Sequence, residues 1–143
     1  MRSRTPQRVL DLLALVPLFS SCTRAELREI AGLGTPVEVR AGSELIKEGA
    51  SGREFFIVIE GEAECSVRGA TAAILGPGDY FGEMALIDGG PRTATIRAAS
   101  LLKVLVMDSR EFSTLMLASP SISLRLLRNI AGRLRDVQAM AIY

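Results

Sequence analysis

One run near the middle of the chain constrains its fold and its ligands more than any other feature. Residues 80–95 contain a glycine, a carboxylate, a short apolar segment, a Gly-Gly-Pro turn and one arginine. Gly82 lets the backbone approach a ligand closely, because glycine has no side chain. Residues 83–87 are too few for a full helix, and a single helical turn there leaves its first N–H groups without internal partners. Those free donors favour an anion.

The end of the same run predicts a chain reversal. Glycines supply unusual backbone dihedrals and proline fixes its own, so residues 89–91 form a turn. The turn can return Arg92 over the start of the short helix, where its planar guanidinium matches a phosphate. Glu83 has no obvious cationic neighbour other than Arg92, and its carboxylate can also accept hydrogen bonds from sugar hydroxyls. The run therefore predicts a site for a small ligand that carries a phosphate and a sugar.

Residues 81–86 followed by 91–95 resemble the phosphate-binding cassette of cyclic nucleotide-binding domains. The resemblance implies that Glu83 receives the ribose 2′-hydroxyl and that Arg92 pairs with the cyclic phosphate. It extends over about residues 10–135, and the upstream glycines fit the turn positions typical of the family: Gly42, Gly49, Gly61 and Gly78. The implied ligand is cAMP, preferred over cGMP only because the family uses cAMP more often.

The resemblance also implies roles for residues around the cassette. The amides of Gly82, Met84 and Ala85 are expected to complete the phosphate cradle. Thr93 is expected to touch the phosphate, or the guanine amino group if the ligand is cGMP. The C-terminal helices are expected to swing over the base, with Arg133 or Leu134 as its lid. The alternative for the arginines of the last helix is a solvated face with no ligand role.

The order of predicted elements is helices, then strands, then helices. Residues 1–34 are expected to be helical, residues 35–107 to form the strands around a cassette at 81–95, and residues 108–143 to be helical again, all within one domain. Capping boxes at Thr23 and Asp108, and Ser119 followed by Pro120, mark helix starts. Short strands at 37–39, 55–59, 63–67, 93–96 and 101–107 predict a barrel or sandwich. The resemblance narrows this to a mainly β fold, a β-roll or jelly-roll (double-stranded β-helix) barrel with flanking helices.

The N-terminal segment has two interpretations. Arginines precede an apolar run that ends at Phe19, which resembles a signal peptide. However, Asp11 and Pro17 interrupt the run, and it is too short to span a bilayer. We favour a helix capped by Thr5 with Pro6 at its first position. With that helix, the predicted location is cytoplasmic, where Cys22 and Cys65 stay reduced.

Composition excludes several classes of function. The chain has no histidine and only two cysteines, which leaves few ligands for a zinc or iron site and no base for a Ser-His hydrolase. A net charge of +1 and the absence of tryptophan argue against a protein that coats nucleic acid or an anionic membrane. We therefore predict a binding module without a metal and without catalytic activity.

Three alternatives stay open. Glu83 and Arg92 can form a surface ion pair with nothing bound, in which case the chain is a structural or dimerising module that has lost its ligand. A small barrel enzyme acting on a sugar phosphate is the third class. An apolar stripe on the last helix either packs on the barrel or forms a seam with a second copy or an effector; its members are Leu127, Ile130, Ala131, Leu134, Val137 and Ala141.

Overall fold

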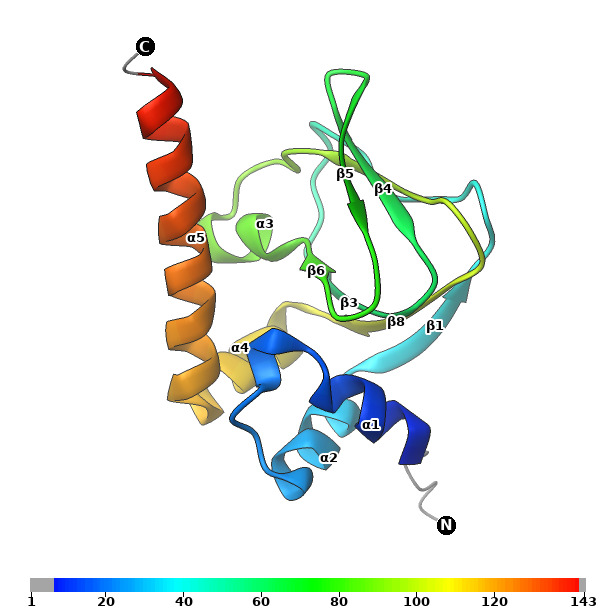
Figure 1. The fold of residues 1–143 in the computed structure, drawn as a ribbon, viewed down its shortest axis with the longest axis vertical. Helices are drawn as coiled ribbons and strands as arrows, with labels where there is room; N and C mark the ends of the chain where they lie inside the picture. The colour runs from blue at the N-terminus through cyan, green and yellow to red at the C-terminus, as the bar shows by residue number, and fades with distance from the viewer. Residues whose placement is uncertain (1–6, 142–143) are drawn as a thin grey trace.

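The computed structural model describes residues 7–141, in which helices flank a β-roll (Figure 1). Before the strands come α1 (Gln7–Ala14), the 3₁₀ turn η1 (Pro17–Phe19) and α2 (Arg24–Leu33). The strands are β1 (Thr35–Val39), β2 (Glu44–Ile46), β3 (Phe55–Glu60), β4 (Ala63–Val67), β5 (Ala70–Leu75), β6 (Tyr80–Phe81), β7 (Thr95–Ala98) and β8 (Leu102–Met107). Helix α3 (Glu83–Asp88) lies between β6 and β7, and α4 (Ser109–Ala118) and α5 (Pro120–Ala141) follow β8.

The strands form two antiparallel four-stranded sheets. Their orders are β1-β8-β3-β6 and β2-β7-β4-β5, so strands distant in sequence lie side by side. The predicted β-roll is confirmed, although the two sheets remain separate and do not close into a continuous barrel. Apolar side chains from both sheets fill the space between them: Ile46, Phe56, Val58, Ala63, Phe81, Ile96, Ala98, Leu102 and Val104.

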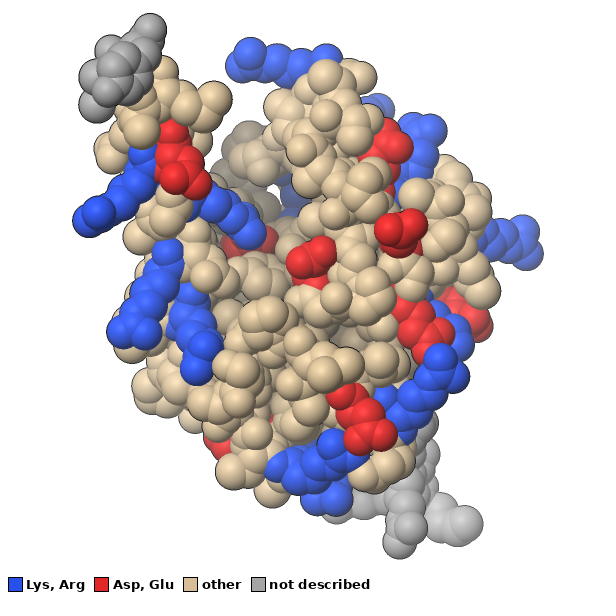
Figure 2. Space-filling view, in the orientation of Figure 1, with Lys and Arg blue, Asp and Glu red and all other residues tan. Residues whose placement is uncertain are grey.

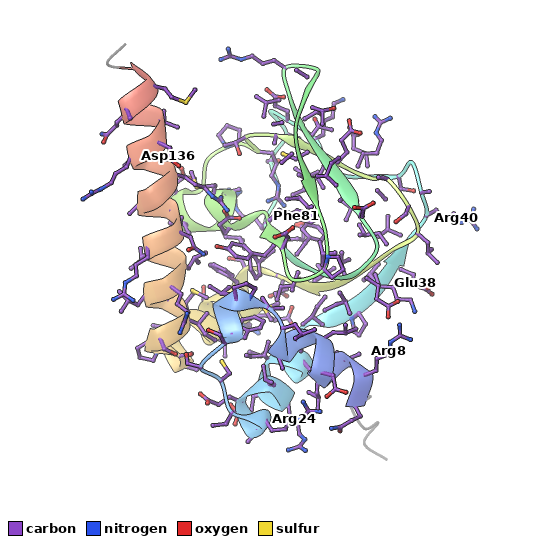
Figure 3. All side chains as sticks on the ribbon, viewed as in Figure 1. Arg8, Arg24, Glu38, Arg40, Phe81 and Asp136 are labelled. Atoms are coloured by element: carbon purple, nitrogen blue, oxygen red, sulfur yellow. The ribbon has the colours of Figure 1, made fainter. Side chains whose placement is uncertain are left out.

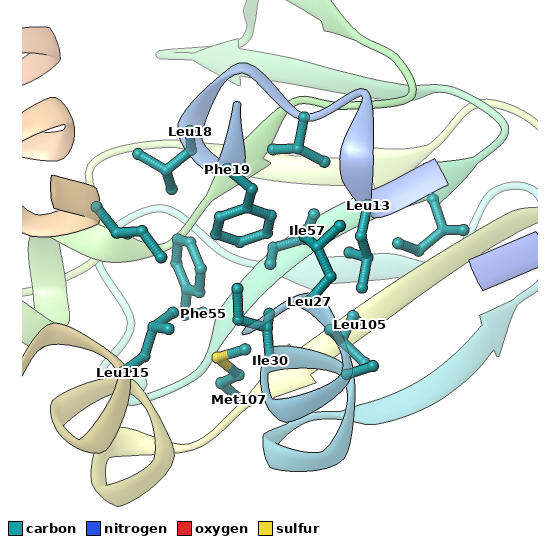
Figure 4. Close-up of a cluster of buried hydrophobic side chains, with 14 of the residues drawn as sticks. Leu13, Leu18, Phe19, Leu27, Ile30, Phe55, Ile57, Leu105, Met107 and Leu115 are labelled. Atoms are coloured by element: carbon teal, nitrogen blue, oxygen red, sulfur yellow. The ribbon is translucent and has the colours of Figure 1, made fainter. Parts of the chain in front are cut away.

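A second core joins the outer face of the β1-β8-β3-β6 sheet to the helices (Figure 4). Side chains alternate across a strand, so Phe55, Ile57 and Ile59 point to the helices while Phe56 and Val58 point into the roll. Because β3 is buried on both faces, its sequence is one continuous apolar run. The helical side of this core comes mainly from α1, α2, α4 and the first turns of α5.

The helix boundaries largely agree with the sequence signals. Thr23 and Asp108 both form complete capping boxes, with Glu26 and Glu111 respectively. Helix α2 ends with Gly34 as its C-cap residue. The predicted N-terminal helix is confirmed over α1, whereas Thr5 and Pro6 lie outside the described residues.

Several strand predictions need correction. The strand after the cassette begins at Thr95, two residues later than predicted, because Arg92 and Thr93 belong to the loop that closes the site. Val67, at the end of β4 beside the hairpin turn, is 37% exposed although it alternates in phase with the buried Ala63. Strands β2, β5 and β6 were not predicted. Strand β5 is exposed almost throughout, so its sequence lacks the alternation that marks a half-buried strand.

Both cysteines are free thiols and half-buried. Burial raises the pKa of the Cys22 and Cys65 thiols above their ordinary value. Among residues 7–141, no helix combines the length and the hydropathy that crossing a bilayer requires.

Candidate functional site

Helix α3 follows a glycine in the left-handed conformation. Gly82 has φ +93° and precedes the six residues of α3. A Cβ on Gly82 would lie 2.5 Å from the Glu54 carbonyl oxygen and 3.1 Å from Arg92 Nη1. The missing side chain therefore permits both the backbone conformation and the close approach of the arginine.

Arg92 is a buried cation at the centre of the site. Its side chain is 6% exposed, and its Nη1 and Nη2 groups donate to the carbonyl oxygens of Gly82 and Glu54, each at 3.1 Å. No carboxylate of the described residues forms an ion pair with it. Burial lowers the pKa of the guanidinium, with a smaller opposing effect from the Glu54 and Glu83 charges. A desolvated guanidinium held only by carbonyls has a strong electrostatic preference for an anion.

The loop before β3 packs against the Arg92 side chain. A Cβ on Gly52 would lie 2.5 Å from Arg92 Nε, so only glycine leaves room for the guanidinium in its present position. The Arg92 backbone is held as well, because its N–H donates to Ala50 and its carbonyl accepts from Gly49, both at 2.9 Å. The sequence analysis missed Gly52 and the Glu54 carbonyl, since neither lies near the cassette in sequence.

Glu83 has a different partner from the one expected. Its carboxylate is buried and accepts from Arg133 Nη1 at 2.9 Å through Oε1. Arg92 is not its ion-pair partner, and neither side chain is on the surface, so the surface ion pair considered for them is wrong. Arg133 lies 50 residues away on α5, which is why local spacing did not reveal it. The second oxygen of Glu83 makes no hydrogen bond to the residues that the structure describes and can accept one from a ligand.

A second contact ties α5 to the same region. Asn129 Nδ2 donates to the Tyr80 hydroxyl at 2.8 Å. Burial raises the pKa of Tyr80, which packs against Phe55 with ring centroids 5.7 Å apart. Asn129 and Arg133 are one helical turn apart, so one face of α5 holds both β6 and the start of α3.

A small pocket lies beside these groups. It is lined by Ile46, Gly82, Met84, Ala85, Arg92, Thr93, Ala94 and Ile96. About 270 Å³ of space, part of it open to solvent, lies within it. A larger hollow of about 690 Å³, also partly open to solvent, lies between α1 and β1; it shares no lining residue with the small pocket, and its lining contains no buried cation.

The pocket brings together most of the residues that the sequence analysis selected. Gly82, Met84, Ala85, Arg92 and Thr93 all line it. Ala85 is buried, whereas Met84 and Thr93 are exposed at its mouth.

The remaining selected residues lie outside this lining. Glu83 is adjacent in sequence but faces Arg133 on α5. Leu134, the other lid candidate, is 56% exposed. Within the described part of the chain, no cluster of side chains is suited to hold a metal ion.

The comparisons with known proteins agree with the fold and with a buried cation in the candidate site. The family model for the cyclic nucleotide-binding domain matches residues 36–119. This chain belongs to the cyclic nucleotide-binding domain family.

Its relatives are regulatory proteins. The chain is 39% identical over 131 residues to a cyclic nucleotide-gated potassium channel of Mesorhizobium japonicum, covering 92% of this chain and 36% of the channel. It is 38% identical over 113 residues to the cAMP-dependent protein kinase regulatory subunit of Schizosaccharomyces pombe, covering 77% of this chain and 27% of the subunit. The chain thus spans about a third of the length of these curated relatives.

A solved structure supports the same family assignment. A structure described as cAMP-bound PfPKA-R (141-441) superposes with a TM-score of 0.81 at 31% identity, covering 92% of this chain and 46% of the other. The helices and strands of this chain are therefore arranged as in that structure over nearly the whole chain.

Proposed function

We propose that this chain is a sensor module that binds a cyclic nucleotide, cAMP in preference to cGMP, in the pocket between α3 and the Arg92 loop. The observation that carries the proposal is the Arg92 guanidinium, which is buried beside a left-handed glycine and the start of a short helix and has no carboxylate partner among residues 7–141. A ring-closed phosphate supplies the missing negative charge.

Each part of the ligand has a counterpart in the site. Arg92 keeps N–H donors beyond the two that bind carbonyls, and these are available to phosphate oxygens. The proposed amide donors belong to the N-cap residue Gly82 and to Met84 and Ala85 of α3, and all three residues line the same pocket. The free oxygen of Glu83 accepts the ribose 2′-hydroxyl, and Thr93 at the mouth reaches the phosphate edge or a guanine amino group.

The ligand signals through α5. Glu83 contacts both the proposed ribose position and Arg133, so a ligand that shifts Glu83 changes the contact that holds α5. A ligand can bias α5 only by its differential affinity for the two helix positions. Arg133 and Leu134 lie on this helix and are the proposed lid for the base. An effector protein that contacts the C-terminal helices then detects the change.

No catalytic role is assigned to the site. Its charged groups, Arg92 and Glu83, bind and orient, and within the described part of the chain neither is paired with a group that would activate a nucleophile. The cytoplasmic location predicted from the sequence agrees with two thiols that remain free.

The direct test is a thermal-shift panel of cAMP, cGMP and linear AMP on the purified chain. Ligands that bind the folded state raise its apparent stability by mass action. We expect a concentration-dependent rise in Tm with cAMP, a smaller rise with cGMP and none with AMP. If no cyclic nucleotide raises the Tm, the chain is instead a structural module that has the fold but no such ligand. If AMP raises the Tm as much as cAMP does, the site does not recognise the ring-closed phosphate and the proposal is wrong.

A further inference from the structure

The loop between β2 and β3, residues 47–54, holds the segment that carries Arg92. The Arg92 N–H donates to the carbonyl of Ala50 at 2.9 Å, and Arg92 Nη2 donates to the carbonyl of Glu54. Because Arg92 Nη1 binds the carbonyl of Gly82, these contacts also connect the loop to the start of α3.

Arg53 connects the same loop to the other end of α3. Its Nη2 group donates to the carbonyl of Gly89 at 3.3 Å, and its Nη1 group donates to the carbonyl of Gly52 at 2.9 Å. Gly89 is the C-cap residue of α3 and is left-handed, with φ +71°. Carbonyl groups at the end of a helix lack partners within the helix, and basic side chains are favourable there. The β2–β3 loop therefore contacts both ends of the short helix.

The positive charge of Arg53 also acts on Arg92. Burial is the main cause of the lowered pKa of Arg92, and the Arg53 charge lowers that pKa as well, whereas Glu54 and Glu83 act in the opposite direction. No carboxylate of residues 7–141 forms an ion pair with Arg53. Two neighbouring cations repel each other, and an anion bound close to both is attracted by both.

The arginines of α5 are the other candidates for a second cation near Arg92. Arg133 is already paired with the Glu83 carboxylate. Every side chain of residues 131–140 is exposed, and this part of α5 stands clear of the β4–β5 hairpin in Figure 2, so the apolar stripe does not pack on the roll there. Asp136, labelled in Figure 3, adds a negative charge to the same part. Arg53 is better placed, because it contacts α3 directly.

We propose that Arg53 is a positioning residue of the ligand site, which holds the Gly89 end of α3 against the β2–β3 loop and adds positive charge beside Arg92. This inference rests on the proposed function, because the anion concerned is the cyclic phosphate. Binding is stronger when the protein has less conformational freedom to lose, and Arg53 restrains α3 before the ligand arrives. Its exposed charge makes the affinity depend on salt, because salt screens exposed charges.

Calorimetric titration with cAMP tests the role of Arg53. We expect Arg53→Ala to raise the dissociation constant about threefold to tenfold, between the effects of an exposed ion pair and of a hydrogen bond to a charged group. Arg53→Lys should recover most of the affinity, because lysine keeps the charge and can donate to the Gly89 carbonyl. Arg40→Ala is the matched control: this exposed arginine follows β1 and lies on the far side of the roll from α3 in Figure 3.

Two further measurements separate this role from a general loss of stability. Between about 50 and about 300 mM sodium chloride, the dissociation constant should rise less steeply for Arg53→Ala than for the wild-type chain, and equally steeply for Arg40→Ala. In the ligand-free chain, hydrogen exchange at the amides of Gly89 and Gly90 should be faster in Arg53→Ala, while the amides of β3 exchange as in the wild type.

The outcomes separate this inference from the function on which it rests. A wild-type chain that binds no cyclic nucleotide would overturn both. If the wild-type chain binds cAMP and Arg53→Ala binds it equally tightly, or if Arg40→Ala weakens binding as much, the inference about Arg53 alone is wrong. Weaker binding by Arg53→Ala with an unchanged salt dependence and unchanged exchange at Gly89 and Gly90 would also contradict it.

Discussion

Arg133 on α5 donates to Oε1 of the buried Glu83 at 2.9 Å and so joins the last helix to the start of α3. One partner is 60% exposed and the other 4% exposed, so the pair lies at the border between solvent and the site. Together with the Asn129–Tyr80 hydrogen bond, it is a side-chain connection between the candidate ligand site and the helix proposed to respond to it.

Arg133→Ala should loosen α5 without unfolding the roll. Because one partner is mostly exposed, we expect a loss of only about 0.5–1 kcal/mol in the free energy of unfolding. Hydrogen exchange should show faster exchange of α5 amides beyond Asn129 in the ligand-free protein. Arg128→Ala, which removes a nearby arginine that makes no ion pair within the described residues, is the control. Equal exchange in the two variants would show that the Glu83 contact does not hold the helix.

Arg92→Ala should weaken cAMP binding by roughly 2–4 kcal/mol, since it removes the cation from a partly buried phosphate. Arg92→Lys should retain part of the affinity, because lysine keeps the charge but lacks the planar fork. Isothermal titration calorimetry measures both, and Arg97→Ala, which removes an exposed arginine on β7, is the matched control. Affinity equal to that of the control would argue against Arg92 as the phosphate ligand.

Glu83→Gln should mainly change the ratio of the affinities for cAMP and its 2′-deoxy analogue, and should change the stability of the fold less. The wild-type chain is expected to prefer cAMP to its 2′-deoxy analogue, because the carboxylate accepts from the 2′-hydroxyl by a charge-assisted hydrogen bond. The variant should lose most of that preference. The measured quantity is the ratio of the two dissociation constants, so a general loss of affinity does not affect the conclusion. A ratio that stays the same would assign recognition of the hydroxyl to another group.

Gly52→Ala should weaken cAMP binding by displacing the Arg92 guanidinium, since the new Cβ would lie 2.5 Å from Nε. Gly32→Ala is the control, because a Cβ at Gly32 meets nothing within 4 Å. Within α2, that change should instead stabilise the fold by about 0.5–1 kcal/mol. Calorimetry and denaturant unfolding distinguish the two outcomes. Unaltered cAMP affinity in Gly52→Ala would mean that the loop adjusts without moving the arginine.

Asp108→Ala should destabilise the fold by about 1 kcal/mol, because it removes the N-cap of α4 from a complete capping box. Asp108→Asn retains a good cap and should cost much less. The midpoint of urea unfolding measures both. Equal losses in the two variants would mean that the negative charge, and not the cap hydrogen bond, is what matters at this position.

Local features of the fold could be predicted from the sequence because their causes are local. The capping boxes at Thr23 and Asp108 depend on residues three positions apart. The short helix α3 depends on a few consecutive residues of the cassette. By contrast, β5 was missed because an exposed edge strand need not alternate polar and apolar residues.

Long-range contacts of the site could not be predicted in the same way. The sequence placed Glu83 beside Arg92, the nearest cation along the chain, whereas the folded chain gives it Arg133. Gly52 and the Glu54 carbonyl also reach Arg92 from a distant loop. Nothing in their local sequence distinguishes them from ordinary turn residues.

The sequence by itself determined which residues form the short helix, the turn and the single arginine of the cassette, because backbone conformation over a few residues follows from their own side chains. Only the tertiary structure decided which partner each charge has and which face of α5 stays uncovered. Those outcomes depend on how distant segments pack. A buried charge needs a partner that is close to it in the folded chain, and that partner need not be close to it in sequence.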